Sequence, residues 1–566
     1  MSSIFSIFNI GSQALFAQQT ALHITGQNIA NANTENYVRQ RAELRESTPV
    51  DHSPGQLGTG VNVNEIIRIK NEFTDFQIRR ENQSMGYLEE KNIFLQQIEN
   101  IFNEPSENGL NAAFSGFYNA LSELQNGTED TSSRSFVTEQ ARALSDVFND
   151  IAGNLEKLKE NLNENIGFKV DEINSITDEI AKLNDQIIRT ESGGQQNAND
   201  LRNRRDGLVR DLSKLGDVFV KELDSGSIDV NFGDQLLVTG VHQIKIEGVL
   251  DENNNQKIIV ENVQSILNVN NGSLKAVLEV RDDILADYKD KLDTLANSFI
   301  DSINSIHVGG VGVARFTQAT SENSVDSSSV PIRNAGLDFD MSNGSFVIAR
   351  YNSASEPLTP ISETTITIDP FVDTLEDIVS QIDAVSGFNA TITSDNKVQV
   401  NVTGSNDFFT FISSGNPPDT DSSGFLKAIG LNTFFKGSDA STIAVADYIL
   451  SDPDKIAAAK NLAPGDNQNV VLMVETQNTG LIDGASFQDY YAGLIGGLGV
   501  QREVTSNREE TQSLILKTLS ERQQAESGVS FDEEAINLLK FQRGYQAAAR
   551  FINVVDGLIE TLISIV

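Results

Sequence analysis

The chain has 566 residues, and 80 acidic against 42 basic residues give it a formal net charge of -38. A charge of this sign repels phosphate backbones, so nucleic-acid binding is disfavoured, and the length predicts several domains instead of one core. The absence of cysteine excludes disulfides, thiolate metal sites and thiolate nucleophiles.

The sequence shows neither a membrane span nor a cleaved secretion signal. No run approaches the roughly 20 apolar residues that cross a bilayer, so we expect no membrane insertion. A cleaved signal needs a basic segment before its apolar stretch, whereas the first basic residue is Arg39. If the protein leaves the cell, we expect another export route.

The N-terminus is predicted to form a helix over about 3–32. Residues 1–34 contain no Asp, Glu, Lys or Arg. Apolar side chains recur at steps of seven, at Phe8, Leu15, Leu22 and Ile29. A helix without charged pairs is not expected to be stable alone, so this column predicts a partner.

Long helices are predicted next, over 65–102, 109–125 and 133–190. Two later stretches carry apolar residues at heptad spacing: Ile173, Ile176, Ile180, Leu183 and Ile187, then Leu201, Leu208, Leu212 and Leu215. Because the second stretch supplies a returning partner for the first, the pattern predicts an antiparallel helical hairpin.

Between 218 and 266 apolar residues recur at every second position, which predicts a small β unit. A helix is expected to return over 274–306.

The segment 318–440 is rich in Ser, Thr, Asp and Asn, and is predicted to be mixed α/β. A helix over 375–385 has Asp373 as its expected N-cap. A hairpin of 388–393 with 397–403 is expected to turn at Asp395-Asn396.

The C-terminus is predicted to form a coiled-coil helix. Helix 487–526 comes first, and Ser530 with Glu533 reads as a capping box that opens the last helix. This helix carries apolar residues at alternating steps of three and four, here called the C-terminal seam: Leu538, Phe541, Tyr545, Ala548, Ile552, Val555, Ile559, Leu562 and Val566. Such spacing is typical of a coiled coil, so we expect the two termini to pair and then to be buried between subunits.

The predicted fold is mainly α with β-containing outer domains: terminal coiled-coil helices, a long-helix bundle core, a small β unit and a mixed α/β insert. The terminal coiled coil, or inner assembly layer, is assigned to 1–60 and 527–566. The helical core takes 61–217, 275–316 and 484–526, the small β subdomain 218–274, and the outer domain 317–483.

No strong catalytic or cofactor pattern is present, so neither an enzyme nor a bound cofactor or metal is expected. Phosphate-binding, dinucleotide-binding, zinc-protease and nucleophile-elbow motifs are all missing from the sequence. Four lone histidines, His23, His52, His242 and His307, are interpreted as structural or surface residues.

Two segments resemble calcium loops weakly. The first runs through Asp251 and has Asn262 where an EF-hand needs a closing Glu. The second runs through Asp419 and Asp421 and ends on Gly430. Polar turns are the preferred interpretation of both.

The stretch Gly26–Gln40 resembles the signature that closes the first helix of bacterial flagellar rod, hook and hook-associated proteins. Its turn residues are Asn28, Asn31, Asn33, Asn36 and Tyr37. The family usually has Pro-Gly where this chain has Glu35-Asn36. Asparagine tolerates a positive φ better than other non-glycine residues, so we expect the turn to be kept.

Residues 530–566 are similar to the C-terminal helix of the same family. Leu201–Val209 and Ser451–Ala457 resemble segments of the hook-associated proteins that join hook to filament. The resemblance implies a structural adaptor of the bacterial flagellum, exported by the flagellar type III apparatus. It further implies self-association in a ring, contacts with hook subunits and other hook-associated or filament junction proteins, and a cytoplasmic export chaperone on the C-terminal helix.

Two alternatives stay open. The chain could be another axial protein, such as a hook or filament subunit, although Leu201–Val209 and the helical hairpin argue against it. It could also be a secreted adhesin or enzyme carried on an axial scaffold, with its activity in 318–445; catalysis by that isolated segment would support this.

Overall fold

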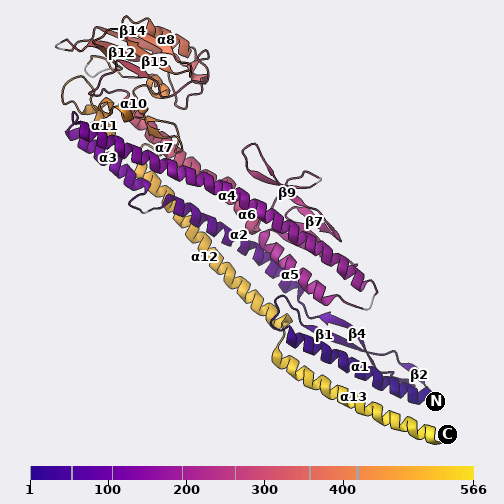
Figure 1. Ribbon diagram of the computed structural model, residues 1–566. Coiled ribbons are helices and arrows are strands. Elements are labelled where there is room, and N and C mark those ends of the chain that lie inside the picture. The colour runs from indigo at the N-terminus through magenta and orange to yellow at the C-terminus, as the bar shows by residue number, and fades with distance from the viewer. Residues whose placement is uncertain are drawn as a thin grey trace. The chain divides into compact units, whose positions relative to one another are not determined.

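The structure is a computed structural model that describes residues 2–52, 55–104, 106–193, 196–261, 263–355, 358–415 and 420–565. The chain folds into two compact units. Unit 1 comprises 1–94, 161–280 and 503–566, and unit 2 comprises 95–160 and 281–502. Three helices contribute residues to both units: α2 (Glu72–Phe102), α4 (Thr131–Glu191) and α12 (Phe487–Ser527) (Figure 1).

The helices of unit 1, besides its parts of α2, α4 and α12, are α1 (Ser2–Ala30), α5 (Asn199–Leu215), α6 (Gly272–Glu279) and α13 (Phe531–Ile565). The predicted antiparallel hairpin is confirmed, because Arg202 of α5 pairs with Glu191 of α4 and Arg205 with Asn184, so the two helices run in opposite directions. Ile173, Ile180 and Ile187 of α4 are fully buried, as is Leu212 of α5.

The strands of unit 1 form small antiparallel sheets. They are β1 (Gln40–Glu46), β2 (Val50–His52), β3 (Gly55–Leu57), β4 (Val61–Arg68), β5 (Val218–Glu222), β6 (Ile228–Phe232), β7 (Gln235–Thr239), β8 (His242–Gln243), β9 (Ile246–Leu250) and β10 (Gln256–Val260). Strand β1 pairs with β4, and β2 with β3. Strands β5 to β8 form one sheet in chain order, and β9 pairs with β10, which confirms the small β unit.

The helices of unit 2, besides its parts of α2, α4 and α12, are α3 (Leu110–Asn126), α7 (Leu285–His307), α8 (Leu375–Asp383), α9 (Phe425–Ile429), α10 (Asp447–Ser451) and α11 (Gln468–Glu475), with a π turn over Val280–Ile284 before α7. Helices α3, α7 and α12 meet in an aromatic cluster. The ring of Phe299 lies 5.3 Å from that of Phe114 and 5.4 Å from that of Phe487, centroid to centroid. Burial of these rings stabilises the packing of the three helices.

The strands of unit 2 are β11 (Gln318–Thr320), β12 (Gly344–Asn352), β13 (Ser362–Ile368), β14 (Phe388–Ile392), β15 (Val398–Val402), β16 (Asp407–Thr410), β17 (Phe435–Lys436) and β18 (Ala444–Val445). They form the sheets β11-β15-β14 and β13-β12-β16 and the pair β17-β18. The two larger sheets and α8 share one hydrophobic core, which includes Phe346, Ile378, Val400 and Phe409. The mixed α/β prediction for this segment is confirmed, including the β14–β15 hairpin, whose turn residue Asn396 has φ 56°.

Two local predictions were wrong. Helix α2 begins at Glu72 and not near 65, because Glu65–Arg68 pair with β1 as the end of β4. Helix α8 is capped by Thr374 and not by Asp373. The Thr374 hydroxyl accepts the backbone N–H of Asp377, and the Asp377 carboxylate accepts the N–H of Thr374.

Candidate assembly site

The two terminal helices lie against each other as an antiparallel pair within unit 1. A Cβ atom on Gly11 would meet Ile552 at 2.8 Å, and one on Gly544 would meet Gln18 at 2.7 Å. Asn28, near the end of α1, bonds to Glu534 at the start of α13. These contacts run in opposite directions along the two helices, so the N-terminus of α1 and the C-terminus of α13 lie at the same end of the pair (Figure 1).

The C-terminal seam lies on the side of α13 that contacts α1. Val555 is 2 % exposed, and Leu538, Phe541, Tyr545, Ala548, Ile552 and Ile559 are all half-buried. The side chain of Leu562, together with Val566, lies outside the described residues. Much of the seam is therefore covered by this chain's own α1.

The N-terminal column is likewise only partly covered. Phe8, Leu15, Leu22 and Ile29 are each half-buried, whereas the most buried side chains of α1 are Ala17, Ala21, Ile24, Thr25 and Asn28. Small residues let a second backbone approach closely, so they mark the inner face better than the large residues do. A heptad pattern also runs through the buried residues Ala17, Ala21, Ile24 and Asn28. The sequence analysis used the seven-step column instead and missed this pattern.

Asn28 is the centre of a buried hydrogen-bond network. Its amide nitrogen donates to the backbone oxygen of Gln40 at 2.9 Å and to Glu534 Oε2 at 3.1 Å. Its amide oxygen accepts the backbone N–H of Gln40 at 3.0 Å and the hydroxyl of Tyr37 at 2.9 Å. Asn28 thereby closes the turn between α1 and β1 and connects it to α13.

An ion pair completes the connection. Arg39 donates to Glu534 Oε1 from Nε at 2.9 Å and from Nη2 at 2.6 Å, and its Nη1 lies 2.7 Å from Glu533. Burial alone would lower the pKa of Arg39, but its bonds to Glu534 and Glu533 raise it. The Glu534 side chain is 2 % exposed, so this charge depends on its partners.

Two further features stabilise the start of α13 and the turn. The predicted cap at Ser530 forms only in part, since its hydroxyl accepts a long 3.5 Å bond from Glu533 N–H while the Glu533 carboxylate pairs with Arg39. Burial, with Asp200 and Glu534 nearby, raises the pKa of Tyr37 to about 12. The Tyr37 hydroxyl therefore stays a neutral donor to Asn28 across the physiological range.

The turn residues rest on α5. Asn36 has φ 61°, as expected for the position where the resembling family has glycine. Arg210 donates to Asn36 Oδ1 at 2.9 Å, and a Cβ atom on Gly207 would lie 3.0 Å from Asn36 Nδ2. Asn31 donates to the backbone oxygen of Gln27 at 3.0 Å. Asn33 is exposed.

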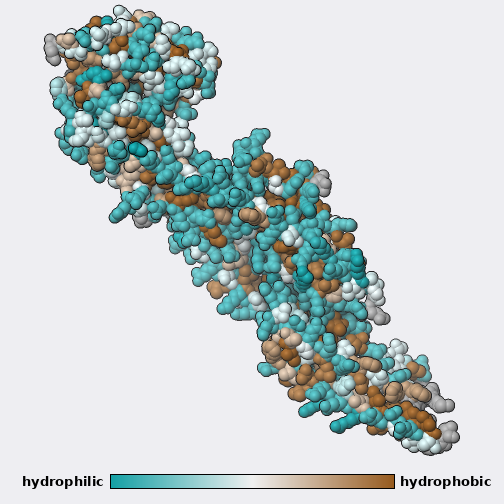
Figure 2. Space-filling view, in the orientation of Figure 1, coloured by the Kyte–Doolittle hydropathy of each residue, from teal (hydrophilic) through white to brown (hydrophobic). Residues whose placement is uncertain are grey.

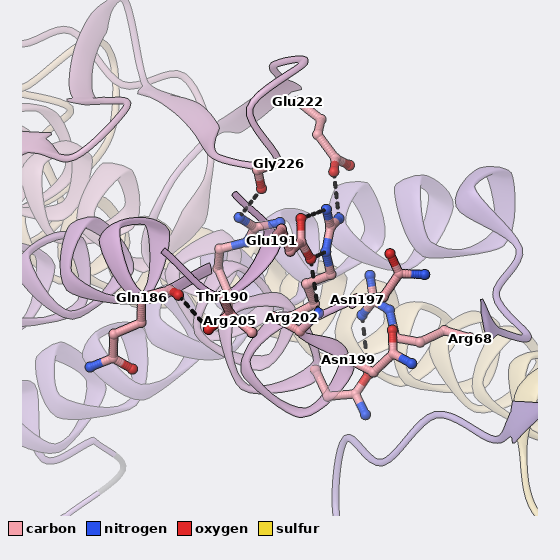
Figure 3. Close-up of polar contacts among 12 residues, drawn as sticks. Arg68, Gln186, Thr190, Glu191, Asn197, Asn199, Arg202, Arg205, Glu222 and Gly226 are labelled. Carbon is pink, nitrogen blue, oxygen red and sulfur yellow. Dashed lines mark hydrogen bonds and ion pairs between the residues drawn. The ribbon is translucent and has the colours of Figure 1, made fainter. Parts of the chain in front are cut away.

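The segment Leu201–Val209 anchors this region through buried charges (Figure 3). Arg202 binds Glu191 at 2.7 Å and Glu222 at 2.5 Å. Arg205, which is 1 % exposed, donates to Asn184 Oδ1 at 2.9 Å and to the backbone oxygen of Gly226 at 2.8 Å. Helix α5 therefore connects α4 to the turn between β5 and β6.

Asp206 extends the same anchor to β4. It lies 2.7 Å from Arg68 and 2.9 Å from Lys70. Burial alone would raise the pKa of Asp206, but the charges of Lys70 and Arg68 hold it below its usual range. Burial lowers the pKa of Arg205 to about 10. Both groups are thus charged at neutral pH.

Three flagellar family models match the chain. The one described as "Flagellar hook-associated protein FlgK helical domain" matches 95–320. "Flagella basal body rod protein" matches 8–37, and "Flagellar basal body rod FlgEFG protein C-terminal" matches 523–565.

Relatives match over the whole length. "Flagellar hook-associated protein 1" of Bacillus subtilis is 30% identical over 576 residues, covering 100% of this chain and 99% of the relative. The chain belongs to the flagellar hook-associated protein 1 family. The protein of the same name from Salmonella typhimurium is 26% identical, covering 99% of this chain and 100% of the relative.

A solved structure shows the same fold. "The structure of the flagellar hook junction protein FlgK from Burkholderia pseudomallei" aligns with a TM-score of 0.53 and 16% identity, covering 80% of this chain and 100% of that chain. Membership of the hook-associated protein 1 family places this chain among the structural proteins of the flagellum. The two rod-type models cover α1 with its turn and α13, so they meet where Asn28 binds Glu534.

The two segments that weakly resemble calcium loops form polar turns in the residues that the structure describes. Asp251 accepts the backbone N–H groups of Asn253 and Asn255 at 2.9 Å, and Asp421 accepts those of Ser423, Gly424 and Leu426. These bonds make a polar turn of each segment, which was the preferred interpretation. Asn262 and Asp419 lie outside the described residues.

His307 has a structural role, as the sequence predicted. It is fully buried, and its Nδ1 and Nε2 bond to the backbone of Asn432 and Ala457. Within the described residues, no group of three or more His, Asp or Glu side chains is placed to hold a metal ion. No helix in the described part of the chain has the length and apolar character that a bilayer crossing needs.

Proposed function

We propose that the chain is an adaptor that joins the flagellar hook to the filament and self-associates in a ring through α1 and α13. The supporting observation is the antiparallel α1–α13 pair, fixed at its base by the bonds of Asn28 and Arg39 to Glu534. The Burkholderia pseudomallei relative is itself titled a hook junction protein. Hook subunits and other hook-associated or filament junction proteins are the proposed neighbours.

Surface chemistry supports an assembly role for this pair. Its exposed side chains include Phe5, Phe16, Val554 and Leu558. Hydrophobic residues are visible over the terminal helices in Figure 2. Exposed apolar residues that recur on one face of a helix are typical of an interface. We assign 1–60 and 527–566 to an inner layer on this basis, with 61–217, 275–316 and 484–526 around it and 218–274 and 317–483 outside.

The proposal also covers the export route and the absence of catalysis. The chain leaves the cell through the flagellar type III apparatus without a cleaved signal, and a cytoplasmic chaperone covers α13 beforehand. A chain without cysteine can be threaded unfolded and refold without disulfide exchange. The protein has no enzymatic activity and acts by assembly alone.

The test is complementation with the full chain and with a variant that lacks 539–566. A bacterial strain without its own hook-associated protein 1 is given either gene, and isolated flagella are examined by electron microscopy and immunogold labelling. We expect the full chain to restore filaments and to label the hook–filament boundary. The truncated variant keeps Arg39, Glu533 and Glu534, so we expect the rest of the chain to fold, but it should not restore filaments.

Two results would refute the proposal. Filament assembly with the truncated variant would show that α13 is dispensable. Gold particles spread along the hook or the filament would instead indicate a hook or filament subunit. Circular dichroism of the purified truncated variant, which should lose only helical signal, is the folding control.

A further inference from the structure

Unit 2 contains a small cavity whose wall includes two arginines, Arg134 and Arg315. Three segments line it: the start of α4 with the turn before it, the loop 311–315 that follows α7, and the loop 459–466 that precedes α11. Its volume is about 120 Å³, well below the roughly 300 to 1,000 Å³ of sites for drug-sized ligands. The cavity therefore has room only for a ligand of a few non-hydrogen atoms.

Arg134 is held rigidly in the cavity wall. Its side chain is 1% exposed, and its Nε donates to the backbone oxygen of Thr128 at 2.8 Å. Its Nη1 donates to the backbone oxygens of Ile456 at 2.7 Å and Asp454 at 3.3 Å, both in the segment Ser451–Ala457 that the sequence singled out. Within the described residues nothing accepts a hydrogen bond from its Nη2, and the Asp454 carboxylate lies 4.0 Å from Nε.

Arg315 lacks a carboxylate partner. It is half-buried, its Nη1 donates to the backbone oxygen of Gly312, and its guanidinium lies 5.9 Å from the centre of the Phe408 ring. In the part of the chain that the structure describes, no Asp or Glu forms an ion pair with it, and its Nε and Nη2 make no hydrogen bond. Burial lowers the pKa of Arg315, and burial together with the nearby charge of Arg315 lowers the pKa of Arg134 to about 10.

The carboxylates in the cavity wall have other partners. Glu129 accepts the backbone N–H of Gly465 at 3.0 Å. Asp466 accepts the backbone N–H groups of Lys460 at 2.8 Å and Asn461 at 2.9 Å. They shape the loop 459–466 and leave Arg315 without a direct counter-charge. Because a guanidinium removed from water without such a partner is unfavourable, a bound anion would stabilise this arrangement.

We propose that the cavity binds a small oxyanion between Arg315 and Arg134. The paired N–H groups of a guanidinium match two oxygens of phosphate, sulfate or a carboxylate. Arg315 contributes Nε and Nη2, and Arg134 contributes Nη2, which are the donors that the chain's own contacts do not use. The same chemistry is offered by a free tetrahedral ion and by a carboxylate group of another molecule, and the probes used below distinguish the two.

A bound oxyanion would have a structural role. It would connect the first turn of α4, the loop 311–315 and the loop 459–466, which are far apart in the sequence. Arg134 already connects α4 to Ser451–Ala457. The anion would therefore fix the segments that lead into and out of the mixed α/β region of unit 2.

The test is isothermal titration calorimetry of the full chain with sodium phosphate, with chloride keeping the ionic strength constant. A net charge of -38 repels anions in general, so saturable binding requires a local site. We expect saturable heat from one site and a higher melting temperature. Phosphate at about 20 times its Kd should shift the folding equilibrium about 20-fold towards the folded state.

Sulfate and acetate are titrated in the same way. Tighter binding of phosphate or sulfate would assign the site to a free tetrahedral ion, and tighter binding of acetate would assign it to a carboxylate of another molecule. Either result supports the oxyanion site. The absence of saturable heat with all three anions would overturn it.

Variants of Arg315 locate the binding. Arg315→Gln should abolish the effect of phosphate, and Arg315→Lys should bind about tenfold more weakly, as expected for the loss of one charge-assisted hydrogen bond. Arg333→Gln is the matched control. Arg333 is also in unit 2 and its guanidinium lies 4.5 Å from the centre of the Phe371 ring, but it is exposed and does not line the cavity. This variant should bind phosphate as the natural chain does.

Melting temperatures without phosphate separate ligand binding from a purely structural role of Arg315. Arg315→Gln removes a half-buried charge that has no direct partner, so it should melt at or above the temperature of the natural chain. A folded Arg315→Gln with an unchanged Kd for phosphate would overturn the proposal. If Arg315→Gln does not fold, Arg315→Lys decides, and equal affinity of this variant and the natural chain would overturn the proposal as well.

Discussion

Asn28 uses both polar atoms of its side chain, and it is buried at the point where α1, the turn and α13 meet. Donating to both Gln40 and Glu534 while accepting from both Gln40 and Tyr37 requires an amide, because a hydroxyl has only one proton to donate. An aspartate at 28 would place a second carboxylate against Glu534. This explains physically why an asparagine stands here in a helix that otherwise buries small and apolar residues.

Asn28→Ala should therefore loosen the base of the terminal pair. The change leaves the backbone groups of Gln40 and the Glu534 carboxylate without one partner, which we expect to cost about 2 kcal/mol. Hydrogen exchange should show faster exchange in α1 and at the start of α13. Asn33→Ala, at an exposed position of the same turn, is the control and should leave exchange unchanged. Equal protection in both variants would refute the role of Asn28.

His307 is held neutral mainly by its burial, and its ring nitrogens have fixed partners. Its Nδ1 lies 2.8 Å from the backbone oxygen of Asn432, and its Nε2 accepts the N–H of Ala457 at 2.9 Å. A proton on Nε2 would replace that acceptor with a donor. Burial lowers the pKa of His307 from 6.5 to about 4.

The stability of unit 2 should consequently decrease as the pH is lowered from 6.5 to about 4. In this window the unfolded chain binds a proton at His307 and the folded chain does not, so the contribution is present above pH 6.5 and is lost as pH falls. The free energy of unfolding of unit 2 should drop by about 1.4 kcal/mol per pH unit from this group. His307→Gln should be less stable overall but less dependent on pH, whereas the exposed His23→Gln should keep the full slope. Denaturant titrations across the window decide between these outcomes.

At the scale of elements, repeats in the sequence were sufficient for the long helices and the hairpin. They failed at two element ends. Strand β4 takes Glu65–Arg68 because β1 pairs with it, a contact that the apolar repeat does not encode. Thr374 caps α8 through a local bond of its hydroxyl to Asp377, which competes with the neighbouring Asp373 for the same role. Sequence analysis singled out the turn asparagines but gave no structural role to Glu534 or Arg39. Their partnership spans nearly the whole chain, and no local pattern encodes it.

The α1–α13 pair depends on close approach at its glycines. A side chain on Gly11 would collide with Ile552, whereas nothing lies within 4 Å of a Cβ on Gly26. Gly11→Leu should destabilise the pairing by about 1 to 3 kcal/mol, because the collision outweighs the gain in helix propensity. Gly26→Leu receives the same propensity gain without the collision, so hydrogen exchange in α13 should rise only in the first variant. Matching exchange in the two variants would mean that the helices do not touch at Gly11.

At the scale of the whole molecule, assembly has to overcome strong repulsion. Each copy carries a formal charge of -38, yet residues 1–34, which include all of α1, contain no Asp, Glu, Lys or Arg. We therefore expect association of the full chain to strengthen as salt rises from about 20 mM to about 300 mM, since salt screens the repulsion and leaves apolar contacts intact. Sedimentation velocity across this range measures it. Weaker association at high salt would show that ion pairs join the copies.

The antiparallel pair also makes the chain a nearly closed loop, because the backbone leaves from the place where it began (Figure 1). A purification tag on either terminus would therefore be added at one and the same location, next to Phe5 and Leu558. Internal turns such as the one at Asp395 are better positions for labels. A short linker between the natural ends should likewise give a circular permutant with the same fold and new ends far along the sequence from the assembly helices.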